Sequence, residues 1–501
     1  MRTRGIQAAA VAAAILFAVA GCGDREETGG PVASGDCRGQ QTTGLTDTGM
    51  KLGGVFPLSG PASAYAELPK GMQAYFDYVN AEQGGIDGRR VEYLLRDDGY
   101  QPPKTVEETR RLVEQDQVFA VLSTLGTPTS AAVWDYLNQR EVPQIFVAGG
   151  ATQWGVGDAH PWTIGWQPSY RAEGQVFARY VREQKPDAAV AVLYQNDDFG
   201  KDLLASFTEA TAGSGVRVIA EQSYEVTDPT VDPQLRNLAG SKADVLLNFA
   251  TPKFAAQTLA ADARNPEWNP LHILTQVSST MSVLAPVGFP NVQNVVTSVF
   301  VKDPADPQWA GDPGMKLYRD KVARYQPGAD PADGYTLVGW AMAQSFHKTF
   351  DAASCKTREG LRDAMRSLDD VAIDLLLPGI TCAPATATDS PWRPCGSSGS
   401  KGTAGCSPAI SSTPRAGEPP PTDTSAARSG AGGPPRSSDE DTHHENQNQR
   451  SDRRDSGRLP RRGGRPGLRP ARARTAGTHL RDHPGGRLRG GGHEREMAAG
   501  G

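Results

Sequence analysis

The sequence predicts an α/β protein with two parallel β-sheets, each flanked by helices, followed by a disordered tail. Short runs rich in Val, Ile and Leu alternate with helical segments from about residue 50 onward. This is the pattern of parallel strands joined by crossover helices. About ten such units are present, which is more than one ordinary open sheet holds. We therefore expect two sheets in two lobes.

Apolar and alternating runs predict the strands of the first sheet, at 50–58, 90–96, 118–122 and 144–147. Apolar residues at helical spacing predict the intervening helices, at 69–82, 104–116 and 128–140. In the first of these helices Met72, Phe76 and Val79 share one face, and Gly84-Gly85 ends it.

The pattern then restarts with a second set of strands and helices. Strands are predicted at 188–194, 216–220, 244–249 and 271–275. Helices are predicted at 171–184, 200–212, 231–238, 252–263, 315–325, 331–350 and 357–368.

Loops after the strands are the expected ligand-binding positions, because parallel sheets bind ligands beyond the carboxyl ends of their strands. These loops are rich in Gly, Ser and Thr and cover residues 58–61, 123–129, 148–152, 195–200 and 275–276. Thr127-Pro128 fits an N-cap followed by proline at the first helical position. Such a helix start offers free N–H groups and a positive dipole end to a carboxylate. The same cap also serves a helix that binds nothing.

Composition excludes several function classes. Residues 1–382 contain 33 Lys and Arg against 45 Asp and Glu, which disfavours nucleic-acid binding. Only His160, His272 and His347 lie in that region, and no Cys-x-x-Cys pair occurs, so we expect no metal and no cofactor.

Sequence motifs of catalysis are absent as well. Nucleophile-elbow, phosphate-loop, dinucleotide and zinc-protease motifs do not occur in the sequence. We expect the adjacent acids, which are Asp97-Asp98, Asp197-Asp198 and Asp369-Asp370, to lie in solvated loops. The chain is therefore not expected to be an enzyme.

The N-terminus resembles a bacterial lipoprotein signal peptide. Arg2 and Arg4 precede an apolar run at 8–20 that is too short to span a bilayer comfortably, and small residues lead to Cys22. We expect cleavage after residue 21, lipidation of Cys22, a flexible tether over 22–49 and an extracytoplasmic, membrane-anchored protein. An ordinary signal peptide with a chance cysteine is the alternative.

The body of the chain resembles the Leu/Ile/Val-binding family of ABC importers, the branched-chain amino acid type. The segments that carry the resemblance are KLGGVFPLSGP at 51–61, VNAEQGGIDG at 79–88 and AVLYQNDDFG at 191–200. The resemblance runs from about residue 50 to 381. It implies a type I periplasmic-binding fold, with two lobes joined by three crossovers. The lobes would close on a small ligand and dock on a permease served by an ATPase subunit.

The resemblance also implies lobe boundaries and ligand contacts. The first lobe would comprise 50–168 and 300–372, and the second 169–299 and 373–381. Gly126, Thr127, Gly150 and Thr152 would hold the carboxylate and amino group of the ligand, and Tyr65 and Phe199 would form aromatic walls. Gln276 falls where relatives that bind amino acids place an acidic residue, and this departure argues against an α-amino acid.

Other interpretations stay open at this point. Amino acids, amides and small aromatic acids all fit the pattern as ligands. A lipid-anchored sensor of the same fold is an alternative function, and an exported enzyme is a more distant one. Cys37 and Cys355 are compatible with a disulfide in an exported protein, but their spacing does not establish one.

Residues 382–501 differ in character from the body. They are rich in Ala, Pro, Ser, Gly and Thr, and then in Arg from residue 450 onward. Codons for 381–411, read from the third base, permit the string LRLVRFQGDRWV, which resembles a closing strand pair of the family. We predict that this tail is a frameshifted translation without stable fold or function; a genuine disordered tail is the alternative.

Overall fold

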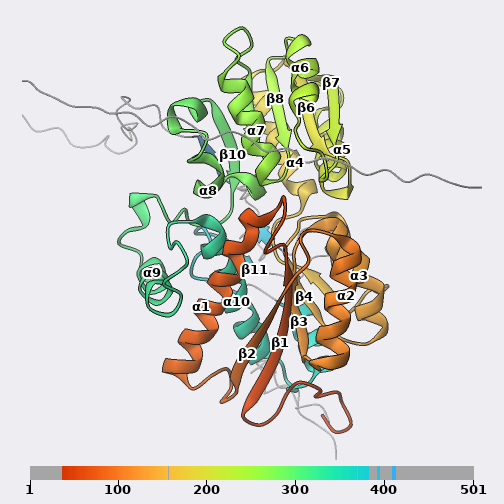
Figure 1. Cartoon of the computed structure of the whole chain (residues 1–501), viewed down its shortest axis with the longest axis vertical. Coiled ribbons are helices and arrows are strands. Elements are labelled where there is room, and N and C mark those ends of the chain that lie inside the picture. The colour runs from red at the N-terminus through yellow and green to blue at the C-terminus, as the bar shows by residue number, and fades with distance from the viewer. Residues whose placement is uncertain (1–36, 156, 369–370, 383–391, 395–408, 413–501) are drawn as a thin grey trace, which may run out of the picture. The chain divides into compact units, whose positions relative to one another are not determined.

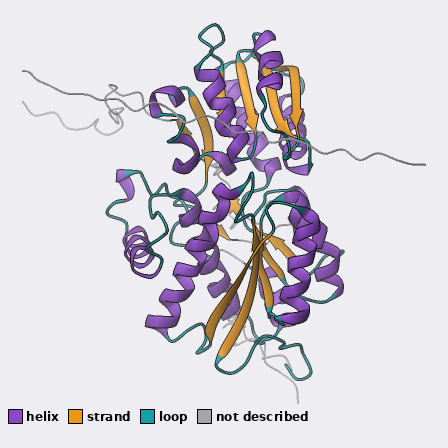
Figure 2. Ribbon diagram, viewed as in Figure 1, coloured by secondary structure: helices purple, strands orange, loops and turns teal. Residues whose placement is uncertain are grey.

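The structure is a computed structural model that describes residues 37–155, 157–368, 371–382, 392–394 and 409–412. Within these residues it contains two mainly parallel sheets with helices on both faces, as Figures 1 and 2 show. Within the described residues, no helix combines the length and the apolar character needed to cross a membrane.

The first sheet has the strand order β2-β1-β3-β4-β5, and all its strands are parallel. Its strands are β1 (Gly49–Phe56), β2 (Arg90–Asp97), β3 (Ala120–Thr124), β4 (Gln144–Val147) and β5 (Thr163–Gly165). Its helices are α1 (Glu67–Tyr78), α2 (Pro102–Arg110), α3 (Thr127–Gln139), α10 (Gly334–Ala352) and α11 (Arg358–Arg366).

Alternating side chains of β1 pack into two hydrophobic clusters, one on each face of the sheet. Leu52 and Phe56 belong to the cluster that includes the buried faces of α1 and α10. Val55 points to the opposite face and packs in the cluster of Leu112 and Val133. Because successive strand residues face opposite sides, both faces of the sheet are covered, and Figure 1 shows α1 and α10 on one side with α2 and α3 on the other.

The second sheet has the order β13-β10-β9-β8-β6-β7. Its strands are β6 (Ala189–Gln195), β7 (Arg217–Tyr224), β8 (Val245–Phe249), β9 (Leu271–Leu274), β10 (Val295–Val299) and β13 (Ala409–Ser412), of which only β13 is antiparallel. The helices around it are α4 (Tyr170–Gln184), α5 (Asp198–Thr211), α6 (Asp232–Gly240) and α7 (Pro252–Ala263). The short α8 (Met281–Leu284) and then α9 (Pro313–Tyr325) follow in the chain.

The chain passes between the two sheets at neighbouring places. It leaves the first sheet after β5 and leaves the second after β10. The Lys302 N–H donates to the Leu375 carbonyl at 2.9 Å, and the Leu377 N–H donates to the Phe300 carbonyl at 3.0 Å. The segment at 300–302 is therefore bound to the segment at 375–377.

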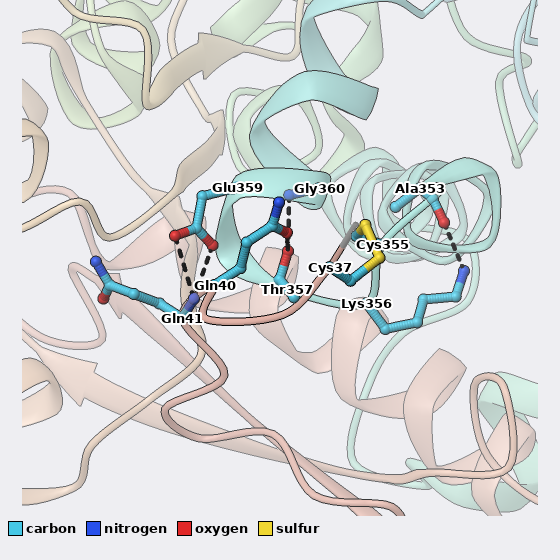
Figure 3. The surroundings of a disulfide bond; sticks show 9 residues. All are labelled: Cys37, Gln40, Gln41, Ala353, Cys355, Lys356, Thr357, Glu359 and Gly360. Atoms are coloured by element: carbon cyan, nitrogen blue, oxygen red, sulfur yellow. Dashed lines mark hydrogen bonds between the residues drawn. A yellow bond between two sulfur atoms is a disulfide. The ribbon is translucent and has the colours of Figure 1, made fainter. Parts of the chain in front are cut away.

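A disulfide joins Cys37 to Cys355, across 318 positions of sequence and with the two Cα atoms 5.6 Å apart. The residues after Cys37 are also bound to the start of α11 (Figure 3). The Gln41 N–H donates to the Glu359 carboxylate at 2.9 Å, and the Thr357 hydroxyl donates to Gln40 Oε1 at 2.7 Å. The pairing that the spacing left open is thus present.

The structure adds elements that the sequence pattern did not predict. β5 and β10 are short and were not predicted as strands. In the segment predicted to lack structure, β12 (Trp392–Pro394) pairs with β11 (Ile380–Cys382), and β13 pairs with β10. Most of 382–501, together with Cys22 and the tether up to residue 36, lies outside the described residues.

Candidate functional site

A cavity of about 240 Å³ lies where the carboxyl ends of strands from both sheets meet. Gly126 after β3 and Ala148 after β4 line it from the first sheet. Thr251 after β8 and Gln276 after β9 line it from the second. This is the position at which parallel sheets bind ligands.

The ends of β3 and β4 are held in an unusual backbone conformation. Ser123 has φ 67° and Phe146 has φ 59°, and both side chains are buried. Side chains disfavour this left-handed region, so the packing around both residues must hold it in place. Gly126 follows with φ 97°, and a Cβ there would lie 2.5 Å from Cε2 of Tyr100. Only glycine fits this position.

The N-cap of α3 is Gly126, with Thr127 and Pro128 as the first two helical residues. The prediction that Thr127 caps this helix was therefore wrong. The chain turns at the positive φ of Gly126, so the helix begins one residue earlier than the Thr-Pro pattern indicated. The Thr127 side chain is 1% exposed, and its hydroxyl has no hydrogen-bond partner among the described residues.

Aromatic rings surround one end of the cavity. The ring centres of Tyr65 and Tyr335 are 5.1 Å apart, and those of Tyr170 and Phe199 are 5.0 Å apart. Tyr100 also lines this end. Burial raises the pKa of the four tyrosines, so each presents a neutral hydroxyl at pH 7.

Two carboxylates brace these aromatic residues, the buried Asp98 and the half-buried Asp197. Asp98 is fully buried and accepts the Tyr100 N–H at 2.8 Å and the Thr105 hydroxyl at 2.8 Å. Asp197 caps α5 and accepts the Phe199 N–H at 3.0 Å. Burial raises the pKa of both carboxyls. The expectation of a solvated loop was wrong for Asp98, because backbone and hydroxyl donors stabilise it inside.

Glu173 of α4 is a second buried carboxylate, and sequence reasoning missed it. It accepts the Gln276 N–H at 2.7 Å, the Thr275 hydroxyl at 3.1 Å and the Ser298 hydroxyl at 3.1 Å. Burial raises the pKa of Glu173 to about 7. The available signal was its position four residues before the buried Phe177, which puts an acid on the apolar face of the helix.

Four of the predicted ligand residues line the cavity, namely Tyr65, Gly126, Phe199 and Gln276. Thr127, Gly150 and Thr152 lie outside the lining. The Gly150 carbonyl accepts the Tyr170 N–H at 2.6 Å, and the Thr152 N–H donates to Asp202 at 3.0 Å. Sequence reasoning missed several lining residues, among them Tyr100, Gln167, Tyr170 and Tyr335.

The cavity offers many hydrogen-bond donors and little charge. Among the described lining residues, Asp303 is the only acid and is exposed, and no Lys or Arg is present. The Nε2 atoms of Gln167 and Gln276 are buried without a partner in the described part of the chain. The same part of the chain contains no group of three or more side chains suited to a metal ion. The lining is therefore suited to a ligand that accepts hydrogen bonds.

Comparisons with curated proteins find distant relatives. "Leu/Ile/Val-binding protein homolog 3" of Brucella melitensis biotype 1 is 25% identical over 199 residues, which cover 39% of this chain and 53% of that protein. An "Amino acid binding protein" of Pseudomonas aeruginosa is 23% identical over 325 residues, which cover 63% of this chain and 81% of that protein. The chain thus spans about half the length of the Brucella relative.

Solved structures share the fold. A "Fatty acid ABC transporter substrate-binding protein" from Thermomonospora curvata has a TM-score of 0.60 at 24% identity, covering 70% of this chain and 89% of that one. A branched chain amino acid ABC transporter protein from Thermus thermophilus, with bound valine, has a TM-score of 0.60 at 14% identity, covering 69% and 91%. The sequence profile of the family described as "Periplasmic binding protein" matches residues 49–391, more than half of the chain. The chain therefore belongs to this family of substrate-binding proteins.

Proposed function

We propose that the protein captures a small carboxylate-bearing solute between its two sheets and delivers it to the permease of an ABC importer. The observation that carries the proposal is the cavity at the strand ends of both sheets, lined by uncharged donors. Relatives named as Leu/Ile/Val-binding and fatty acid ABC transporter proteins support the same role.

The start of α3 is the proposed carboxylate position. A helix of this length offers free N–H groups and a positive dipole end at its N-terminus. The buried Thr127 hydroxyl adds a donor without a partner in the described residues. The Tyr170 N–H donates to the Gly150 carbonyl at 2.6 Å, and Tyr170 lies on the cavity wall.

Calorimetry with a panel of carboxylates, amino acids and amides tests capture. A ligand at one hundred times its Kd should stabilise the protein by about 2.7 kcal/mol. Thr127→Val should weaken binding by about 1–3 kcal/mol, because it removes the free hydroxyl. Thr109→Val is the matched control, since Thr109 is equally buried without a partner in the described residues but lies near the end of α2 and not at the start of α3. Equal affinity in wild type and Thr127→Val would contradict the carboxylate position.

Delivery and anchoring need separate tests. The residues before Cys22 resemble a lipoprotein signal, and we propose that this cysteine is lipidated. Cys22→Ser should move the protein from the membrane fraction to the soluble extracytoplasmic fraction. Ligand-loaded protein should stimulate ATP hydrolysis by the cognate importer in vesicles; failure to do so would contradict delivery and favour a sensor.

A further inference from the structure

We infer, on the basis of the proposed function, that the ligand is a monocarboxylic acid with an extended apolar body and no ammonium group. The inference rests on two properties of the cavity. One is an apolar end of the cavity, and the other is the absence of a buried acid from the described lining residues.

The apolar end is formed by consecutive elements of the second half of the chain. α8 contributes Met281 and Leu284, the turn that follows contributes the buried Val292 and the exposed Phe289, and β10 contributes the buried Val295. These side chains have no polar group to hydrogen-bond a ligand. An aliphatic or aromatic body of the ligand would be removed from water there, which is favourable in proportion to its apolar area.

An ammonium group would lose its hydration in this cavity without compensation. Asp303, the one acid among the described lining residues, is exposed. The Glu173 carboxylate lies outside the lining, and the Gln276 N–H and the hydroxyls of Thr275 and Ser298 occupy its oxygens. Asp197 is likewise occupied as the cap of α5. A buried charge without a partner is strongly disfavoured.

Donors dominate where a polar head group would lie. The Nε2 atoms of Gln167 and Gln276 have no partner among the described residues. The neutral Tyr65 hydroxyl adds a further donor, whereas the Tyr335 hydroxyl already donates to the Val277 carbonyl at 2.7 Å. A carboxylate accepts several such hydrogen bonds at once, whereas an ammonium only donates. The described lining thus offers donors to a carboxylate but no buried anion to an ammonium, which favours an acid over an amino acid of equal size.

A pair of ligands that differ only in the ammonium group tests the inference. Leucine without its amino group is 4-methylpentanoate, so the carbon skeletons match. By calorimetry at pH 7, we expect 4-methylpentanoate to bind at least tenfold more tightly than leucine. Leucine binding of equal or greater strength would overturn the inference and leave solute capture intact. If no carboxylate, amide or amino acid binds, the proposed function itself fails.

Chain length tests the apolar end. Octanoate should bind at least tenfold more tightly than butanoate.

Val295→Thr replaces a methyl group by a hydroxyl at nearly constant volume. It should weaken octanoate binding five- to twentyfold while leaving the affinity for butanoate unchanged. Val296→Thr is the matched control, because Val296 is the next buried residue of β10 and does not line the cavity. Leu284→Asn, at a half-buried position, is a second variant for the case that Val295→Thr fails to fold. Unchanged octanoate affinity in a folded lining variant would overturn the inference.

Discussion

The carboxylate of Glu173 accepts the backbone N–H of Gln276 at 2.7 Å, although 103 positions of sequence separate the two residues. This bond fixes the loop after β9, which lines the cavity, to the buried face of α4. Thr275 and Ser298 bind the same carboxylate through their hydroxyls. The conformation of the cavity wall therefore depends on a side chain that does not line it.

Glu173 should make the stability of the protein depend on pH. Because its pKa rises from 4.5 to about 7 on folding, the folded state binds more protons in this window. Its contribution to the free energy of unfolding, about 3 kcal/mol, is fully present below pH 4.5 and is lost as the pH rises through 7. Urea unfolding from pH 4.5 to 8 should show this decline in wild type and not in Glu173→Gln. Glu183→Gln, at an exposed position of the same helix, should retain it, and an identical pH profile in Glu173→Gln would contradict the assignment.

Gly126→Ala should destabilise the protein and abolish ligand binding. Alanine is strained at φ 97°, and its Cβ would overlap the Tyr100 ring. We expect a loss of about 2 kcal/mol or more in the free energy of unfolding. Gly240→Ala provides the comparison, because Gly240 ends α6 with open space around its Cβ position and should be neutral or slightly stabilising. A Gly126→Ala protein as stable as wild type would mean that the loop has another conformation.

Gln276→Glu should create affinity for α-amino acids. The new carboxylate would supply the partner that an ammonium lacks in the lining, a charge-assisted interaction worth about 1–3 kcal/mol. Gln276→Met keeps the approximate volume without charge and should gain no amino-acid binding. Calorimetry with leucine on both variants distinguishes the effect of charge from that of size. If the two variants bind leucine equally, charge at this position is not the determinant.

Removing the disulfide should lower the free energy of unfolding without weakening ligand binding. The bond closes a loop of 318 positions, and loss of such a cross-link costs about 3–5 kcal/mol. The double variant Cys37→Ser with Cys355→Ser should show this loss in urea unfolding and bind ligand as the wild type does. Glu359→Gln, which weakens the neighbouring bond to the Gln41 N–H, should cost much less. Equal losses of unfolding free energy in the double cysteine variant and in Glu359→Gln would indicate that hydrogen bonds, and not the disulfide, hold the segment after Cys37 in place.

Sequence periodicity predicted most of the fold because strand and helix patterns are local. β4 and α7 have the predicted bounds, 144–147 and 252–263. β5 has three residues, too few for a distinct pattern, and β10 (VVTSV) was missed although its five residues make it longer than β4. The burial of two carboxylates, Asp98 and Glu173, was not predicted. The groups that donate hydrogen bonds to them, such as the Thr105 hydroxyl and the Gln276 N–H, reach them only in the folded chain.

The site was predictable only in part. Tyr65 and Phe199 line the cavity and were identified from resemblance alone. Tyr335 was missed because α10, more than 250 residues after Tyr65, brings it to the same wall. Thr152 was expected to contact the ligand and is not among the residues that line the cavity; its contact with a ligand stays a prediction. No local pattern reveals which strand-end residues turn inward.

The bond between Cys37 and Cys355 also determines where mechanical force enters the protein. In the proposed anchored form, any pull from the membrane travels along residues 22–36 and reaches Cys37 first. Fully extended, this tether spans about 50 Å. At Cys37 the tension divides between the backbone that leads to β1 and the disulfide, which leads to the segment between α10 and α11. The disulfide thus distributes such a pull over two parts of the chain that are 318 positions apart in sequence.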